Sequence, residues 1–153
     1  MPKAKQRITK NLPPPAGYDK IKPTLDSLLA KLKDAQTSTL ATTTTTKLTW
    51  PIIKLNHQIS RFVYDMFYQR KAISKDLYDW LLLQPYTNAE LIAKWKKQGY
   101  EKLCCINCIQ TSSTNHGNAC VCRVTRKTLE KNGEADREVE CITCGCTGCA
   151  STD

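Results

Sequence analysis

Apolar residues recur at intervals of three and four along the first two-thirds of the chain, which predicts amphipathic helices. The first predicted helix covers residues 24–36, directly behind Pro23. One of its faces is formed by Leu25, Leu28, Leu29 and Leu32. The second begins near Thr49 with Pro51 in its first turn, where proline is tolerated because that N–H has no helical partner. Its apolar face is the strongest in the sequence and comprises Ile52, Leu55, Ile59, Phe62, Val63, Met66 and Phe67.

Two shorter helices are predicted after these. Ser74 is placed to cap a helix over Lys75–Gln84, which Pro85 ends. The sequence TNAE at 87–90 has the form of a capping box and starts a helix that ends at Gly99. We therefore expect a mainly α fold with a compact bundle, whose core includes Trp50, Trp80 and Trp95.

The other segments lack this periodicity. Residues 1–23 are basic and proline-rich, as in an extended arm that orders on a partner, and 37–46, TSTLATTTTT, reads as a low-complexity linker. After Lys102, small and polar residues separate cysteines, with one short helix expected around 127–131. The predicted division is an arm at 1–23, a helix at 24–36, a linker at 37–46, a helical bundle at 47–103 and an irregular cysteine-rich module at 104–153.

Positive charge is concentrated outside the cysteine-rich segment. The formal charge is +9; residues 1–46 hold eight Lys and Arg against three Asp and Glu, 47–103 hold ten against five, and 104–153 hold five against six. The excess predicts an anionic partner, of which nucleic acid is the commonest. No apolar run approaches the ~18 residues of a membrane span, and none follows the basic N-terminus as in a signal peptide. We expect no membrane contact and an intracellular protein with reduced thiols.

All nine cysteines lie in the last third of the chain. They form the patterns C-C-x-x-C (Cys104, Cys105, Cys108), C-x-C (Cys120, Cys122) and C-x-x-C-x-C-x-x-C (Cys141, Cys144, Cys146, Cys149). A C-x-x-C turn aims two thiolates at one metal, and structural zinc takes four ligands. The odd count and the expected compartment argue against a disulfide framework. The pattern therefore predicts that these nine residues bind zinc.

Nine thiolates are one more than two separate four-cysteine sites require. Three zinc ions need twelve ligand positions, which nine cysteines fill when six bind one ion and three bridge two. Adjacent Cys104 and Cys105 would then serve neighbouring metals, because their side chains diverge. The count favours this trinuclear cluster, with two zinc ions and a spare cysteine as the alternative. Nine thiolates with three Zn²⁺ would carry a charge of −3, which cations nearby can offset. The cations closest in sequence are Lys102, Arg123, Arg126 and Lys127.

The two histidines and the remaining motifs add little chemistry. His116 lies among the cysteines, which already complete the ligand count, and His57 is interpreted as a packed helix residue. The sequence shows no H-x-E motif of a zinc deaminase, no phosphate-binding loop and no G-x-S-x-G. Zinc held by four thiolates has no open position for chemistry. We expect no enzymatic activity and no small-molecule substrate.

Six stretches of the chain together resemble one known family. They are PPPAGYDKIKPTLDSL (13–28), HQISRFVYDMFY (57–68), RKAISKDLYDWL (70–81), LIAKWKKQGYEKLCC (91–105), CVCRV (120–124) and CGCTGCASTD (144–153). On these motifs the chain resembles the bud-site-selection-protein-thirty-one family, also called the G-ten family, over nearly its whole length. The resemblance implies a nuclear, non-enzymatic pre-mRNA splicing factor that is a structural component of the activated and catalytic spliceosome. It also implies association with the Prp19-related assembly, a place near the active-site RNA and pre-mRNA, and zinc on all nine cysteines.

The sequence departs from the family pattern at three positions. Thr147 stands where the terminal motif commonly reads CGCRGC, Asn107 stands where C-C-x-x-C often has arginine, and Thr125 replaces a usual proline. Two charges that could touch RNA from the cysteine-rich face are therefore absent.

The expected partners are spliceosomal proteins, small nuclear RNA and pre-mRNA. The candidate RNA contacts are Arg70, Lys71, Lys75, Lys94, Lys96, Lys97, Lys102, Arg123 and Arg126. Two other interpretations stay open. A zinc-binding, chromatin- or DNA-associated nuclear protein would need a base-reading helix, and none stands out between the cysteines. A metallothionein-like metal buffer would lack the aromatic helical bundle.

Overall fold

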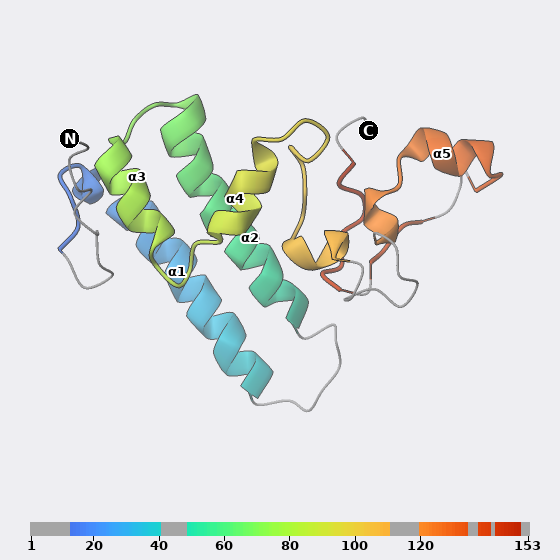
Figure 1. Ribbon diagram of the computed structural model, residues 1–153. Coiled ribbons are helices and arrows are strands. Elements are labelled where there is room, and N and C mark those ends of the chain that lie inside the picture. The colour runs from blue at the N-terminus through green and yellow to red at the C-terminus, as the bar shows by residue number, and fades with distance from the viewer. Residues whose placement is uncertain (1–12, 41–48, 111–119, 135–137, 142, 151–153) are drawn as a thin grey trace.

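The computed structural model describes residues 13–40, 49–110, 120–134, 138–141 and 143–150. Within these ranges every regular element is a helix, and the last third folds as irregular chain around the cysteines (Figure 1). The mainly α fold with an irregular cysteine-rich end is confirmed. Residues 1–12 of the predicted arm and 41–46 of the predicted linker lie outside the described residues.

Helix α1 (Tyr18–Leu40) is longer at both ends than the helix predicted at 24–36. Its first turns precede Pro23, which lies inside the helix although it supplies no N–H. Burial explains the early start, because Ile21 is 1% exposed and Leu25 is fully buried. The Tyr18 ring also packs edge-on against Trp80 of α3, with the ring centroids 5.5 Å apart. The predicted arm therefore ends before Tyr18.

The last turn of α1 takes in residues that the sequence assigned to the linker. The Thr37 hydroxyl donates to the Lys33 carbonyl at 2.9 Å, and the Ser38 hydroxyl donates to the Asp34 carbonyl at 2.9 Å. These bonds satisfy the hydroxyl groups against the helix itself, so polar and β-branched residues continue it. The prediction that the linker begins at Thr37 is wrong.

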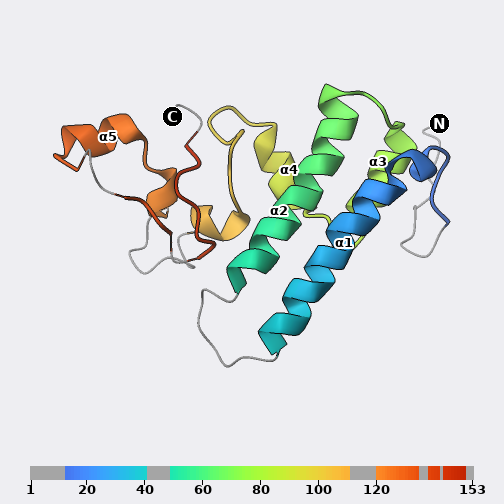
Figure 2. The ribbon, with the colours of Figure 1, turned by 180° about the vertical axis from the view of Figure 1, so that it is seen from behind.

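Helix α2 (Trp50–Tyr64) runs antiparallel beside α1, as both ribbon views show (Figure 2). It continues into a π-helical turn, Asp65–Gln69, which the sequence pattern did not reveal. The Arg70 N–H donates to the Asp65 carbonyl at 2.8 Å, five residues back, as the wider turn requires. The widened turn brings Phe67 into a parallel stack with Tyr78 of α3, with the ring centroids 4.2 Å apart.

Helices α3 (Lys75–Leu82) and α4 (Ala89–Trp95) complete the bundle. The predicted cap of α3 is confirmed, because the Ser74 side chain accepts a hydrogen bond from the Leu77 N–H at 3.3 Å. The predicted capping box is wrong. Asn88 is the N-cap of α4 and accepts from the Leu91 N–H at 3.1 Å, whereas the buried Thr87 hydroxyl has no hydrogen-bond partner.

The chain leaves α4 four residues before the predicted end at Gly99. From Trp95 it continues through tight turns, in which the Lys97 N–H donates to the Lys94 carbonyl at 2.9 Å. The Trp95 indole N–H then donates to the Leu103 carbonyl at 2.9 Å, and both residues are almost completely buried. This bond fixes where the chain enters the cysteine-rich segment.

One apolar core runs from the bundle into the cysteines. It contains Trp80, Trp95 and Leu103 together with buried cysteines such as Cys108 and Cys141. Trp50 is the exception to the predicted tryptophan core, because it is only half-buried and lies against Gly145 of the cysteine-rich segment. Trp50 therefore joins the two parts of the molecule instead of filling the bundle.

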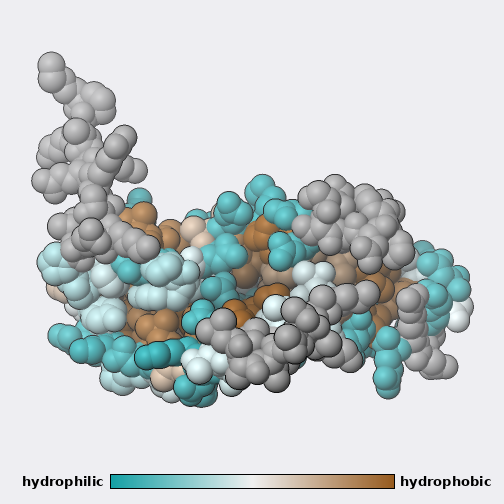
Figure 3. All heavy atoms as spheres, turned by 90° about the horizontal axis from the view of Figure 1, so that it is seen from below, coloured by the Kyte–Doolittle hydropathy of each residue, from teal (hydrophilic) through white to brown (hydrophobic). Residues whose placement is uncertain are grey.

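The described part of the cysteine-rich segment contains the 3₁₀ turns η3 (Ile106–Ile109) and η5 (Val121–Arg123) and the short helix α5 (Arg126–Lys131). The short helix predicted around 127–131 is thus confirmed. In Figure 3, teal polar residues are interrupted by small brown apolar patches over both the bundle and the cysteine-rich end. Among the described residues, no helix has the length and apolar character needed to cross a bilayer.

Candidate metal centre

The nine cysteines come together from three separate segments of chain. One segment leads into η3, the second leads into η5, and the third is the loop at 141–149. The structure describes all nine cysteines and pairs none of them in a disulfide. Their sulfur atoms gather into three groups of four, and within each group all sulfurs lie within 4.8 Å of one another. The groups are Cys104, Cys105, Cys108, Cys144; Cys104, Cys122, Cys146, Cys149; and Cys108, Cys120, Cys122, Cys141.

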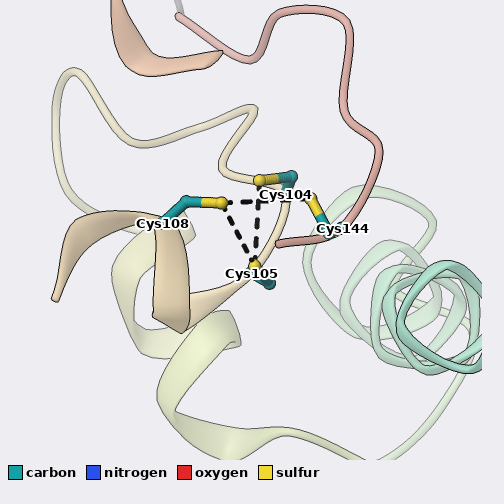
Figure 4. A group of neighbouring side chains, drawn as sticks. All are labelled: Cys104, Cys105, Cys108 and Cys144. Carbon is teal, nitrogen blue, oxygen red and sulfur yellow. Dashed lines mark hydrogen bonds between the residues drawn. The ribbon is translucent and has the colours of Figure 1, made fainter. Parts of the chain in front are cut away.

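Nine residues form three groups of four because three cysteines belong to two groups each. Cys104, Cys108 and Cys122 are the shared residues, and each of the other six belongs to one group. This is the ratio of bridging to terminal ligands that a trinuclear cluster requires. Figure 4 shows the first group, in which the four sulfurs point toward a common centre.

The spacing of the sulfurs fits zinc. Four sulfurs at the usual Zn–S distance of ~2.3 Å in a tetrahedron are about 3.8 Å apart. The Cys104 and Cys122 sulfurs are 3.8 Å apart, those of Cys108 and Cys141 also 3.8 Å, and those of Cys122 and Cys149 3.7 Å. Clustered cysteines at these separations are the donor set that zinc prefers.

One expectation about the cluster differs in detail. Cys104 and Cys105 were expected to serve different metals, but their sulfurs lie 4.0 Å apart in the same group, and Cys104 is shared with the second group. The backbone explains how neighbours can meet. Cys105 has φ −163° and ψ 162°, an extended conformation, before the chain turns into η3.

Backbone hydrogen bonds hold the three segments in register. The Cys120 N–H donates to the Cys108 carbonyl at 2.8 Å, and the Cys149 N–H donates to the Cys122 carbonyl at 2.8 Å. The Cys144 N–H donates to the Cys141 sulfur at 3.3 Å, a contact that stabilises a thiolate. Each shared cysteine on a 3₁₀ turn is thus tied to a neighbouring segment through the main chain.

Arg123 binds the cysteine cluster to the turn after α4. Its guanidinium donates to the carbonyl of Cys149 and, at 2.7 Å, to the carbonyl of Gly99. It also approaches the Cys149 sulfur at 3.5 Å and lies 5.2 Å from the centre of the Tyr100 ring. The sequence put Arg123 near the cluster as a cation; the structure places it as a clamp between cluster and bundle.

The thiols of Cys104 and Cys105 influence each other's ionisation. The hydrogen bond between Cys104 and Cys105 raises the pKa of the Cys104 thiol far above its usual range and lowers the pKa of Cys105. In such a pair one thiolate forms at the expense of the other. A divalent metal removes this conflict because it favours the deprotonated form of every ligand.

A cleft of about 380 Å³ separates the loop at 144–149 from α2. Lys54, His57 and Lys102 line it together with four of the cysteines. Burial, followed by the charge of Arg61, lowers the pKa of His57. Lys54 escaped the sequence prediction, because it lies far along the chain from any cysteine. Its position in the same cleft as four cysteines suits it to offset the charge of a zinc–thiolate cluster.

Comparison with known proteins places the chain in a family. The family model described as pre-mRNA-splicing factor BUD31 matches residues 1–151. The pre-mRNA-splicing factor BUD31 of Saccharomyces cerevisiae is 51% identical over 160 residues, with both chains fully covered. The chain belongs to the BUD31 family.

Other relatives agree in name and length. The pre-mRNA-splicing factor cwf14 of Schizosaccharomyces pombe is 47% identical over 153 residues, again covering both chains fully. The BUD31 homolog of Danio rerio is 47% identical over 150 residues, which is 98% of this chain and 99% of the relative. The BUD31-family resemblance inferred from the sequence is therefore confirmed.

The candidate RNA contacts of this BUD31-family chain lie in different surroundings. The exposed candidates are Arg70, Lys71, Lys75, Lys96, Lys97, Lys102 and Arg126. The half-buried candidates are Lys94 and Arg123. The Lys94 ammonium lies 5.8 Å from the centre of the Tyr100 ring, on the same ring that Arg123 approaches. His116 lies outside the described residues. Tyr68 was not singled out from the sequence, yet the Lys96 ammonium lies 4.8 Å from the centre of its ring.

Proposed function

We propose that this BUD31-family chain is a non-enzymatic splicing factor of the nucleus, a structural component that braces proteins and RNA in the activated and catalytic spliceosome. The observation that carries the proposal is full-length similarity to two proteins named as pre-mRNA-splicing factors. The proposed setting is the Prp19-related assembly, near the active-site RNA and the pre-mRNA.

The cysteines would hold three zinc ions in this proposal. Cys104, Cys108 and Cys122 would bridge, because each belongs to two sulfur groups, and the other six would bind one ion each. Bound zinc would neutralise and cross-link the thiolates of the three chain segments. Coordination by four sulfurs leaves no open position, so the cluster is structural. The protein's own contribution is the backbone bonding around each sulfur and the Arg123 clamp.

The basic surface would meet RNA. The residues proposed for that contact are Arg70, Lys71, Lys75, Lys94, Lys96, Lys97, Lys102, Arg123 and Arg126. Phosphate contacts by several such side chains together supply affinity without reading sequence. A brace needs contacts of this kind, because it positions the RNA and leaves base recognition to pairing between RNA strands.

A metal buffer fits the structure less well. Residues of the cysteine cluster share one buried core with Trp95 and Leu103, so removing metal would disturb the fold. A buffer must release its metal without that penalty. This argues for a structural metal centre in a protein scaffold.

Purification of the tagged chain from nuclear extract tests the proposal. We expect spliceosomal proteins and small nuclear RNA to accompany the wild-type chain. Cys108→Ala, which removes a sulfur shared by two groups, should lose both, whereas Lys131→Gln on the exposed face of α5 should keep both. Recovery of duplex DNA or chromatin proteins without spliceosomal RNA would overturn the proposal in favour of a DNA-associated protein.

A further inference from the structure

The π-helical turn at the end of α2 carries an aromatic side chain to the surface among cations. Tyr68 is half-buried, and its ring is held from inside by Tyr64, Phe67 and Tyr78, with ring centroids 5.0, 4.8 and 5.5 Å away. The Lys96 ammonium from the end of α4 lies over the same ring, 4.8 Å from its centre. The ring is therefore fixed by the bundle, while an exposed lysine side chain covers it.

This contact joins two groups of basic residues that are separate in the sequence. Arg70 and Lys71 directly follow the π-helical turn, and Lys75 begins α3, one turn before Tyr78. Lys96 comes from the far side, at the end of α4. We call Tyr68, Arg70, Lys71, Lys75 and Lys96 the Tyr68 surface.

All four cations of the Tyr68 surface are exposed. Acidic residues on α3 are Asp76 and Asp79, of which Asp79 is near enough to act on Tyr68. Cations outnumber these carboxylates two to one, so the surface carries a net positive charge. It suits an anionic ligand with a flat, stackable group.

Backbone geometry sets the same segment apart. π-helical turns are rare and occur often at functional sites. Lys71, two residues after the π-helical turn, has φ +50° and is the one non-glycine residue with a positive φ among the described residues. Strained backbone of this kind persists where the surroundings enforce it. Two unusual backbone features therefore place the ring and its neighbouring cations.

The relative strengths of two contacts indicate what the ring can bind. An exposed cation–π contact contributes about two- to fivefold to an equilibrium constant. A nucleic-acid base stacked on an aromatic side chain contributes roughly 5- to 150-fold. A base can therefore replace the Lys96 ammonium on the ring, and the released ammonium can meet an adjacent phosphate.

We propose that the Tyr68 surface binds single-stranded RNA, with one base stacked on Tyr68 and phosphates held by Arg70, Lys71, Lys75 and Lys96. This deepens the proposed function, on which it rests, by assigning a base-stacking contact to the bundle. Unpaired RNA is the fitting class because only an unpaired base has a free face for the ring.

Binding of a fluorescently labelled single-stranded oligoribonucleotide to the zinc-loaded full chain tests this. Tyr68→Leu should weaken binding roughly 5- to 150-fold, and Tyr68→Phe, which keeps the ring, should bind like wild type. Lys96→Gln should reduce the slope of log affinity against log salt by about one. Lys131→Gln on α5 is the charge-matched control and should leave the slope unchanged. Thermal melting of each variant checks that it is folded.

Three outcomes would overturn the proposal. Tyr68→Leu could bind the single strand as tightly as wild type. The substitutions could weaken binding of a duplex of the same sequence as strongly as they weaken binding of the single strand, which would mean that charge alone makes the contact. The wild-type chain could bind no oligonucleotide while Lys96→Gln loses splicing proteins from nuclear extract, which would make the surface a protein interface. The proposed function is tested separately, because co-purification with the spliceosome does not depend on oligonucleotide binding.

Discussion

Trp50 at the start of α2 packs against Gly145 of the loop at 141–149. Gly145 has φ +71°, and a Cβ added there would lie 2.5 Å from Cε3 of the Trp50 ring. Gly145 is therefore required twice, once for its backbone conformation and once for the absence of a side chain. Gly145 is thus one of the positions at which the helical bundle packs against the cysteine-rich segment.

Gly145→Ala is predicted to lower the free energy of unfolding by about 2–5 kcal/mol, from backbone strain plus overpacking. Gly133→Ala is the matched control, because Gly133 has φ +78° and a Cβ added there would meet no atom within 4 Å. It should cost only about 1 kcal/mol. Thermal or urea unfolding of the zinc-loaded protein measures both. Equal effects of the two substitutions would show that Trp50 does not press on Gly145.

Arg123 is the second residue whose role is specific to its shape. Arg123→Lys keeps the charge but cannot donate to Cys149 and Gly99 together, so we expect a loss of about 1–3 kcal/mol. Zinc should also pass to a chromogenic chelator faster than in wild type. Arg70→Lys on the exposed end of the π-helical turn is the control and should change neither measurement. A variant as stable as wild type would limit Arg123 to a charge role.

Tyr68 offers a pH measurement. Burial raises the pKa of this hydroxyl, but hydrogen bonds with Lys96 and Tyr78 outweigh burial and hold the pKa below its ordinary value of 10.0. The ionised ring therefore favours the folded state, so this stabilisation grows as the pH rises through the folded pKa and is lost as the pH falls through it. Lys96→Gln should raise the pKa of Tyr68 in an ultraviolet titration. An equal pKa of Tyr68 in the two proteins would show that the Lys96 ammonium does not contact this ring.

At the scale of elements, the helix ends decide how the bundle closes. Asn88 caps α4 through the Leu91 N–H, and the neighbouring Thr87 hydroxyl is buried without a hydrogen-bond partner. The sequence motif alone pointed to Thr87. Substitutions at Asn88 and at Thr87 therefore distinguish which of the two residues caps α4.

Asn88→Ala is predicted to cost about 0.5–2 kcal/mol because it removes a cap. Thr87→Val should be neutral or stabilising, because it replaces an unpartnered buried hydroxyl by a methyl group of the same shape. Chemical denaturation of both variants compares them directly. A greater loss of stability in Thr87→Val than in Asn88→Ala would show that Thr87 caps α4, as the capping box predicts.

The helices also show which features of the fold could be predicted from the sequence and which could not. The short helix α5 was expected in a segment that lacks apolar periodicity. Periodicity identified α2 and, together with the Ser74 cap, α3, because these signals lie within a few neighbouring residues. It missed the early start of α1, where burial of Ile21 outweighs the helix-breaking tendency of Pro23. The π-helical turn was also missed, because aromatic contacts with α3 set it and not a local signal.

The cysteine patterns predicted a metal centre and its ligand arithmetic but not which sulfurs are shared. Cys104 groups with Cys144, and Cys108 with Cys141, although each pair is far apart in the sequence. Spacing reports only local pairs, so the sharing of Cys104, Cys108 and Cys122 depends on how the three segments fold onto one another. The same holds for Lys54 and Tyr68, whose neighbours come from distant parts of the chain.

At the scale of the whole molecule, the bundle and the cysteine cluster form one folding unit. Their buried residues belong to one continuous core, and the Trp95 indole is bonded to the chain just before the first cysteine. Metal bound at the cluster would therefore stabilise the helices as well. The expected consequence is a single cooperative unfolding transition.

Removal of zinc by a strong chelator is predicted to change the tryptophan fluorescence of the bundle together with the loss of metal. Two tryptophans should report the loss of metal. The Trp95 indole is hydrogen-bonded to the Leu103 carbonyl, and the Trp50 ring packs against Gly145. Trp50→Phe and Trp95→Phe variants separate the two signals. Fluorescence that stays constant while zinc leaves would mean that the bundle folds independently of the metal centre.

The central claim is that nine cysteines make three tetrahedral sites by sharing three sulfurs. Native mass spectrometry of the purified chain, compared with its mass after denaturation in acid, measures the metal directly. The account predicts a difference equal to three zinc ions, with fewer in Cys108→Ala because that sulfur belongs to two sites. A wild-type protein that holds two zinc ions, or none, would contradict it.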